Sequence, residues 1–90
     1  MVSEMLEIAS QLSEDEKYDQ AAKYYENILQ TESDNIVIIN DYGVTLQNLG
    51  DYNHALVMYD MILNLEPKNM NALINKGSVL HTLGKYFEAI

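Results

Sequence analysis

Residues 36–69, IVIINDYGVTLQNLGDYNHALVMYDMILNLEPKN, form a unit from which the rest of the chain can be interpreted. The unit holds two amphipathic segments, which are separated by a glycine-containing turn and followed by a proline. In the first segment, Ile39 and Leu46 lie seven residues apart, on one face of a helix. In the second segment, Ala55 and Tyr59 are separated by about one helical turn. The stretch therefore predicts a hairpin of two helices.

The same pattern returns at an interval of 34 residues in both directions along the chain. Of the 18 residues from 18 to 35, 7 are identical to their counterparts in residues 52–69. The residues that coincide at this interval are Tyr18, Tyr52 and Tyr86; Ala21, Ala55 and Ala89; Leu12, Leu46 and Leu80; Gly43 and Gly77; and Gly50 and Gly84. A fixed period of this length is typical of proteins built from stacked structural repeats.

The repeat predicts five helices and the start of a sixth. Apolar residues recur at helical spacing over residues 2–14, 18–31, 36–48, 52–65 and 70–82. Asn35 can cap the third of these helices, and Pro67 forces the chain out of helical geometry after the fourth. Gly84 is expected to turn the chain into a sixth helix that begins at residue 85 or 86. No strand is expected, because the single β-branched run lies where both neighbouring units are helical.

Small residues predict where the two helices of each hairpin approach closely. Ala9, Gly43 and Gly77 occupy such positions on the first helix of each unit. In the fifth helix we expect Leu73, Gly77 and Leu80 to face inward. Each hairpin leaves one apolar flank that the next hairpin must cover. Stacking with a small rotation produces a curved array, whose first helices line the inner surface.

The charge of the chain limits its partners. The net charge is −9, and arginine is absent. Residues 1–34 carry nine carboxylates against two lysines, a net charge of −7. Because nucleic-acid binding depends on Lys and Arg side chains that displace counterions from phosphates, we expect no nucleic-acid partner. The acidity favours a neutral or basic partner, although it also has a simpler interpretation as a source of solubility.

Composition also bears on location. The chain has no cysteine, so a disulfide framework is excluded and a reducing cytoplasm is the expected compartment. No apolar run approaches the roughly 20 residues that a membrane span requires. The first residues lack the layout of a signal peptide. We therefore expect no membrane partner.

The sequence lacks the residue patterns of an enzyme. It has no cysteine nucleophile, no glycine-rich phosphate loop, and no histidine beside a carboxylate at a useful spacing. His54 and His81 are far apart, and both are interpreted as exposed side chains, although His81 could respond to the charge of a ligand. The Glu-Asp-Glu run at residues 14–16 is interpreted as a solvated turn rather than a cation site. Neither catalysis nor a cofactor or metal is expected.

The spacing of the unit resembles that of the tetratricopeptide repeat (TPR) family. The residues that carry the resemblance are Ile39-x2-Tyr42-Gly43-x2-Leu46, Ala55-x3-Tyr59 and Pro67. The resemblance implies an all-α fold, a right-handed α-α superhelix of antiparallel helix pairs with about two and a half repeats. The repeats would span residues 2–35, 36–69 and, incompletely, 70–90, within one domain of residues 1–90 that is an excerpt of a longer array. The chain departs from the family pattern at Met5, Glu16, Ser33, Ile39 and Leu73.

The resemblance also implies a role in holding other proteins, usually as an extended peptide or helix in the concave groove. The groove residues that it implies are Leu6, Glu7, Ser10, Glu14, Val37, Asn40, Asp41, Val44, Gln47, Asn48, Asn71, Ile74, Asn75, Ser78 and His81. Their Asn and Gln amides can bond the N–H and C=O groups of a peptide. The simpler interpretation is that these residues form solvated helix faces.

Some family members bind a carboxylate with a clamp of cationic and amide side chains. The corresponding positions here are Leu6, Ser10, Asp41, Asn71 and Asn75. None of these side chains is cationic, and Asp41 would repel a carboxylate. An acidic-tail ligand is therefore not expected.

A second hypothesis for function is self-association. The last residues are apolar and would leave the flank of the final hairpin uncovered. Copies of the chain could cover this flank for one another, and exchange of helices is one way to do so. The residues assigned to this flank are Leu80, Leu83, Tyr86, Phe87, Ala89 and Ile90.

Overall fold

Residues 2–89 fold into five α-helices. A computed structural model describes the backbone of residues 2–89 and the side chains of residues 2–85. The helices are α1 (Val2–Glu14), α2 (Tyr18–Thr31), α3 (Ile36–Asn48), α4 (Tyr52–Leu65) and α5 (Met70–Ala89). The bounds of the first four helices agree with those predicted from the sequence. Residues 2–89 contain no strand, as expected.

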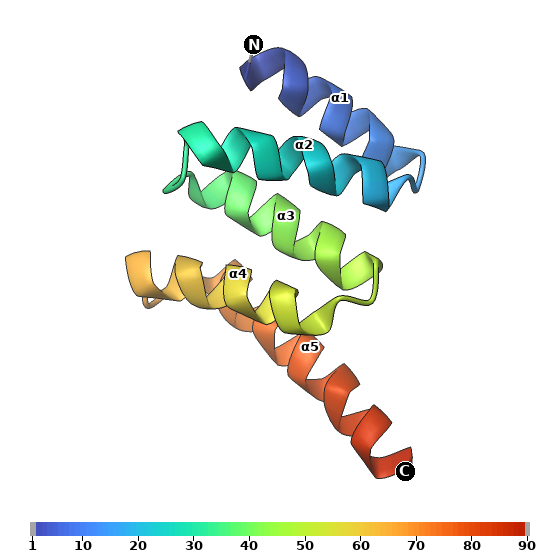
Figure 1. Cartoon of the computed structure of the whole chain (residues 1–90). Coiled ribbons are helices and arrows are strands. Elements are labelled where there is room, and N and C mark those ends of the chain that lie inside the picture. Colours follow the sequence, from blue (N-terminus) through green and yellow to red (C-terminus); the bar gives the residue numbers. More distant parts are fainter. Residues whose placement is uncertain (1, 90) are drawn as a thin grey trace.

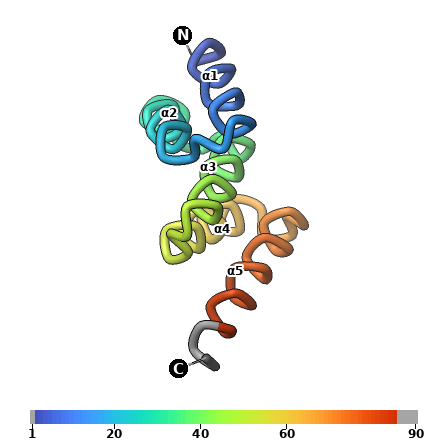
Figure 2. Tube along the Cα trace, turned by 90° about the vertical axis from the view of Figure 1, so that its right-hand side faces the viewer, coloured from blue at the N-terminus to red at the C-terminus, as the bar shows by residue number. Residues whose placement is uncertain are grey.

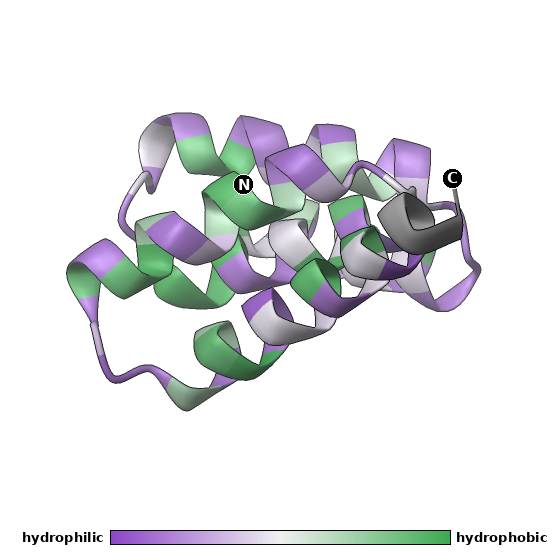
Figure 3. Cartoon of the chain, turned by 90° about the horizontal axis from the view of Figure 1, so that it is seen from below, coloured by the Kyte–Doolittle hydropathy of each residue, from purple (hydrophilic) through white to green (hydrophobic). Residues whose placement is uncertain are grey.

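The helices are stacked in chain order along an elongated molecule of 44 × 29 × 18 Å. Each helix packs against the next one in sequence, and α3 also contacts α5 (Figure 1). Viewed from the side, α2 and α4 lie to one side of α1, α3 and α5 (Figure 2). Hydrophobic and hydrophilic residues alternate along the helices, as amphipathic packing requires (Figure 3). The first helices of the hairpins therefore share one face of the array.

Polar side chains define where the helices begin. Asn35, Asp51 and Asn69 each precede a helix, and each accepts a hydrogen bond from the backbone N–H three residues later. The three distances are 3.3, 3.4 and 2.9 Å. Such a bond satisfies one of the N–H groups that the first turn of a helix leaves without a partner. The expectation that Asn35 caps α3 is confirmed.

The two hairpin turns differ in the type of residue that adopts a positive φ angle. Gly50 joins α3 to α4 with a φ of 82°, in the region that glycine adopts without steric cost. The matching turn between α1 and α2 contains Glu16, which has a φ of 60°. A residue with a side chain is strained at positive φ. The α1–α2 turn therefore carries a backbone strain that the α3–α4 turn avoids.

Two clusters of buried side chains form the core. The first cluster lies between α1, α2 and α3 and consists of Ala9, Ala21, Tyr25, Ile28 and Ile38. The second lies between α3, α4 and α5 and consists of Ile39, Leu46, Ala55, Tyr59, Ile62, Ala72 and Val79. α3 contributes to both clusters through adjacent residues, because it has a neighbour on each side.

Gly43 allows α3 and α4 to approach closely. A Cβ atom at Gly43 would lie 2.7 Å from Cε1 of Tyr59, which is shorter than a van der Waals contact. The prediction of a small residue at this crossing is confirmed. The tyrosine ring occupies the space that a side chain would otherwise fill.

The prediction of a turn at Gly84 is wrong. α5 continues through Gly84 to Ala89, so no sixth helix begins at residue 85 or 86. Each residue added to an existing helix gains a hydrogen bond, whereas a turn is stabilised only when the next helix packs back. Among residues 2–89, no helix follows α5 and packs back on it. Continuation of the helix is therefore favoured.

The inward face predicted for α5 is also wrong. Leu73 and Leu80 are exposed, and no described atom lies within 4 Å of a Cβ built at Gly77. α5 instead buries Ala72 and Val79 against the second cluster. The expected face is turned away from α4, where a helix following α5 would have to cover it.

Candidate functional site

The faces of α1, α3 and α5 that point away from α2 and α4 form the candidate site. Three of the predicted groove residues are exposed apolar side chains: Val37 at 65%, Ile74 at 62% and Val44 at 38%. Exposed aliphatic groups on neighbouring helices can contact apolar side chains of a ligand.

A chain of hydrogen bonds links α3 to α5 within this face. Asn75 donates through Nδ2 to Oδ1 of Asn40, at 3.0 Å. Gln47 donates through Nε2 to Oγ of Ser78, at 3.3 Å, and accepts a bond from the Tyr59 hydroxyl, at 2.9 Å. Burial raises the pKa of Tyr59 to about 12, so this hydroxyl stays protonated and can donate. Four predicted groove residues thus bond to one another.

These internal bonds leave part of the amide capacity available to a ligand. Each Asn side chain has two N–H donors and an oxygen that can accept two bonds. The pair that joins Asn40 and Asn75 uses one acceptor site and one N–H. The Nδ2 group of Asn40 and the Oδ1 atom of Asn75 are not used in that bond, and they form no side-chain hydrogen bond among the described residues. One donor and one acceptor can therefore bond a peptide C=O and N–H.

Asp41 is the charged group at the middle of the face. Its side chain is half-buried on α3, and burial raises its pKa above the usual range. Its carboxylate forms no hydrogen bond or ion pair within the described part of the chain. A desolvated carboxylate without a cation is unfavourable, so a cationic group of a ligand would relieve the cost.

A hollow of about 250 Å³ lies where the N-terminal ends of α3 and α5 meet. Its lining combines the apolar Ile36 and Val37 with amide side chains at positions 40, 69 and 71. This volume is smaller than that of a typical small-molecule site, which begins at roughly 300 Å³. A hollow of this size and polarity can receive one side chain of a peptide. A larger hollow, about 400 Å³, is formed by four consecutive residues of the α4–α5 turn and is an open dent.

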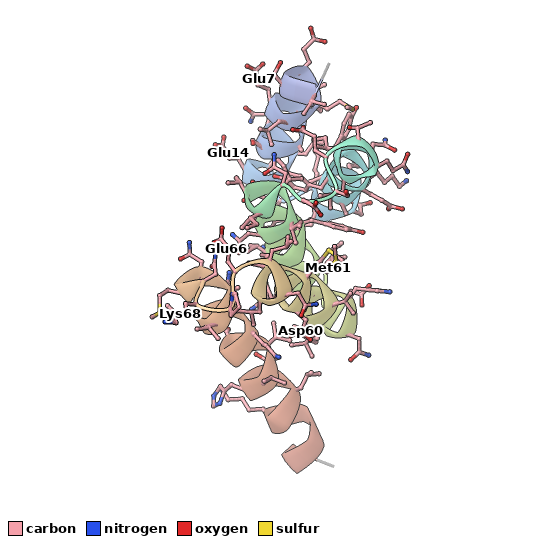
Figure 4. All side chains as sticks on the ribbon, turned by 90° about the vertical axis from the view of Figure 1, so that its left-hand side faces the viewer. Glu7, Glu14, Asp60, Met61, Glu66 and Lys68 are labelled. Carbon is pink, nitrogen blue, oxygen red and sulfur yellow. The ribbon has the colours of Figure 1, made fainter. Side chains whose placement is uncertain are left out.

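The α1 end of the face is acidic. Glu7 and Glu14 both point from α1 to the side away from α2 (Figure 4). Lys68, in the turn before α5, points to the same side of the molecule (Figure 4). Leu6 is half-buried and packs partly against the first core cluster. The remaining predicted residues of the face, Ser10, Asn48, Asn71 and His81, are exposed.

Comparison with known proteins identifies the family. Residues 5–69 match the family described as YpiA-like, C-terminal tetratricopeptide repeats. The chain belongs to the tetratricopeptide repeat family. Two solved structures of MamA match the chain with a TM-score of 0.88: a segment from Desulfovibrio magneticus RS-1 at 26% identity and an RS-1 double mutant at 25%. A further MamA mutant, at 21% identity, shares the fold with a TM-score of 0.84. No curated protein sequence matches this chain significantly.

The match confirms the predicted TPR superhelix. The alignments cover 98% of this chain and about half of each MamA chain, 50% and 49%. As a TPR protein, the chain is a protein-interaction module. None of the helices described is long and apolar enough to cross a membrane. The described side chains contain no group of three His, Asp or Glu residues that could hold a metal ion.

One expectation about the histidines is wrong. His54 does lie beside a carboxylate: its Nδ1 atom is 2.6 Å from Oδ2 of Asp51, one turn earlier. This hydrogen bond is the main reason that the pKa of Asp51 is lowered. The Asp51 side chain also caps α4, so the spacing of three residues follows from the helix start. The pair is exposed, and its carboxylate caps the helix, so we interpret it as a capping feature.

Sequence reasoning did not find the bonds between α3 and α5. Asn40 and Asn75 are 35 residues apart, and Gln47 and Ser78 are 31 apart. Equivalent residues lie 34 positions apart on every second helix, and α3 contacts α5. Pairs of polar residues separated by close to 34 positions are therefore the signal that could have predicted these bonds.

The predicted self-association flank lies partly outside the described side chains. Leu80 is exposed, and Leu83 is half-buried against the second cluster. Tyr86, Phe87, Ala89 and Ile90 fall outside the described side chains. Self-association of this TPR chain stays a prediction.

Proposed function

We propose that this TPR chain is a scaffold that holds a neutral or basic extended segment of a partner protein along α1, α3 and α5. The observation that carries the proposal is the half-buried Asp41 carboxylate, which forms no ion pair with any described side chain. Scaffold proteins of this kind need no catalytic group, because their effect comes from bringing partners together.

The face supplies three kinds of contact to such a segment. A Lys or Arg side chain of the ligand pairs with Asp41 and offsets the cost of its burial. The free donor of Asn40 and the free acceptor of Asn75 bond the ligand backbone. An apolar ligand side chain enters the hollow over Val37.

The distribution of charge along the face sets the orientation of the bound ligand. The acidic residues of α1, Glu7 and Glu14, extend the negative potential beyond Asp41 along the same face. Complementary charge raises the association rate and disfavours acidic competitors. The ligand is therefore expected to carry its positive charges toward the end that lies on α1.

The proposal can be tested by selecting ligands from a random 12-residue peptide library on the whole chain. We expect the selected peptides to be enriched in Lys or Arg. Asp41→Asn should weaken their binding about tenfold or more, because desolvated charge pairs are costly to break. Asp34→Asn removes the same charge from the exposed turn before α3 and serves as the matched control. Equal losses in both variants, or enrichment of acidic peptides, would contradict the proposal.

A further inference from the structure

A row of apolar side chains runs along α4 on the side away from the groove. Val57, Met61 and Leu65 follow one another at intervals of four residues and form one ridge of the helix, the α4 ridge. Val57 and Leu65 are exposed, and Met61 is partly buried against the second cluster. Asp60, which pairs with α5, and Met61 leave α4 on different sides (Figure 4). A continuous apolar row of this kind is typical of an interaction surface, whereas apolar residues scattered singly are not.

The α4 ridge lies on a side of the helix that neighbouring repeats leave uncovered. A hairpin before α4 and a helix after it are both described, and the ridge is exposed with both in place. The equivalent positions on α2, 34 residues earlier, are Lys23, Asn27 and Thr31. All three are exposed, although the α3–α4 hairpin follows α2. A following hairpin therefore leaves this side of the second helix open, and the side is polar on α2 but apolar on α4.

The surface around the α4 ridge is nearly free of unpaired charge. By contrast, α1 carries three carboxylates and no lysine, in a chain of net charge −9. Over residues 52–65, α4 carries one carboxylate, Asp60, which pairs with Lys76 at 2.6 Å. The His54 ring on α4 bonds the Asp51 carboxylate. The ridge therefore does not select a charged partner, and two copies of this acidic chain can meet there without bringing unpaired carboxylates together.

The spacing of the α4 ridge is self-complementary. Met61 lies at its centre, with an aliphatic side chain four residues away on either side. Rows of this spacing are the ridges that interdigitate when two helices pack. In a two-fold dimer, a contact from residue i to residue j is matched by a contact from j to i. Antiparallel α4 helices that cross at Met61 would thus bring Val57 of each chain against Leu65 of the other.

We propose that the α4 ridge is a self-association site, at which two copies of this chain pair through antiparallel α4 helices. The flexible methionine at the centre can adapt to its counterpart, which a branched side chain would do less well. This site differs from the C-terminal flank, because it lies wholly within α4 and is complete in the described chain.

Such a dimer leaves both grooves free. Because α2 and α4 lie to one side of α1, α3 and α5, pairing through α4 turns the groove faces of the two chains outward (Figure 2). A partner protein with two recognition segments could then bind both grooves, and the second contact would be favoured by its high effective concentration. The pairing itself does not depend on the groove, so failure of peptide binding would leave it unaffected.

The test is sedimentation equilibrium of the whole chain over a concentration series. One helix pair buries less than the roughly 1,200 Å² at which stable interfaces begin, so we expect a reversible dimer that forms at high micromolar concentration. Val57→Lys and Leu65→Glu, each alone, should weaken the dimer about tenfold or more, because each buries a charge against an apolar side chain. The double variant should recover most of this loss, since each lysine then faces a glutamate. Its net charge equals that of the wild type, so overall repulsion is unchanged.

Two controls accompany the series. Thr31→Glu places the same charge at the equivalent exposed position of α2 and should leave the dimer unchanged. Because Val57 and Leu65 are exposed, the single variants should keep the helical circular dichroism signal of the wild type.

Three outcomes would overturn the proposal. A chain that stays monomeric up to millimolar concentration would leave the α4 ridge to a different protein. A dimer that neither single variant weakens would place the contact elsewhere, such as at the C-terminal flank. A double variant as weak as the single ones would contradict the antiparallel pairing of Val57 with Leu65.

Discussion

α3 and α5 occupy the same position in successive repeats, yet they bury different faces. Ile39 and Leu46 of α3 are 0% and 6% exposed, whereas their equivalents Leu73 and Leu80 are 45% and 50% exposed. α3 lies between α2 and α4, while α5 packs on α4 and α3 from one side. The pattern of apolar residues is shared, and only the presence of a covering helix differs.

This difference shows that burial in a repeat protein is a property of the neighbour as well as of the residue. Each repeat has one face for the preceding hairpin and one for its own second helix. On α5 the face for the preceding hairpin is buried through Ala72 and Val79. The face for its own second helix is exposed, and its residues should contribute little to the stability of the described fold.

The largest expected effect comes from truncating the two equivalent aliphatic residues. Ile39→Ala should lower the free energy of unfolding by about 2–5 kcal/mol, because it leaves a cavity between α3 and α4. Leu73→Ala should change it by less than about 0.5 kcal/mol, as is usual for an exposed residue. Urea denaturation followed by circular dichroism measures both values. Similar losses in the two variants would show that the Leu73 face is covered in solution.

The two glycines should respond to substitution with opposite signs. Gly43→Ala should destabilise the chain by about 1–3 kcal/mol, because its methyl group overlaps the Tyr59 ring. Gly77→Ala should stabilise it by up to about 1 kcal/mol, since alanine favours the helix and meets no atom. Thermal denaturation of both variants provides the measurement. A loss of stability in Gly77→Ala would contradict the finding that Gly77, unlike Gly43, has space for a side chain.

The side-chain hydrogen bond between Asn75 and Asn40, which joins α5 to α3, should make a smaller contribution to stability. Asn75→Ala removes the donor to Asn40 and should cost about 0.5–1.5 kcal/mol in free energy of unfolding. Asn40→Ala should cost a similar amount, and the double variant should cost less than the sum of the two. The measurement is a double-mutant cycle in urea. Additive losses would mean that the pair does not interact in solution.

Asp41 on α3 and Asn75 on α5 are also equivalent, and they should differ in their response to pH. Because burial raises the pKa of Asp41, the folded chain binds a proton there more tightly than the unfolded chain. The ionised carboxylate thus costs stability at neutral pH, and this cost disappears as the pH falls through the raised pKa.

Asp41→Asn should therefore raise the melting temperature slightly at pH 7. The gain should shrink in acid, near and below the ordinary pKa of an aspartate. Asn75→Ala, which removes no titrating group, should show a difference from the wild type that does not vary over the same pH range. Melting curves between pH 3 and pH 7 make the comparison, and a gain for Asp41→Asn that grows toward low pH would contradict the assignment.

Sequence patterns alone predicted the 34-residue period, the first four helices, the capping role of Asn35 and the close crossing at Gly43. The period is found by comparing one hairpin with the next. The other features depend on residues within one hairpin, so local spacing and capping chemistry are sufficient to predict them. The exposure of groove residues such as Val37 and Ile74 follows from the same periodicity.

The packing of the helices in three dimensions was needed to establish the course of α5, the exposure of Leu73 and Leu80, and the pairing of Asn40 with Asn75. A turn at Gly84 requires a following helix that packs back, and a buried face requires a helix on top of it. Side-chain pairing between repeats requires the relative position of α3 and α5. Each of these depends on which surfaces meet in space, and an amphipathic pattern specifies a surface without specifying whether another covers it.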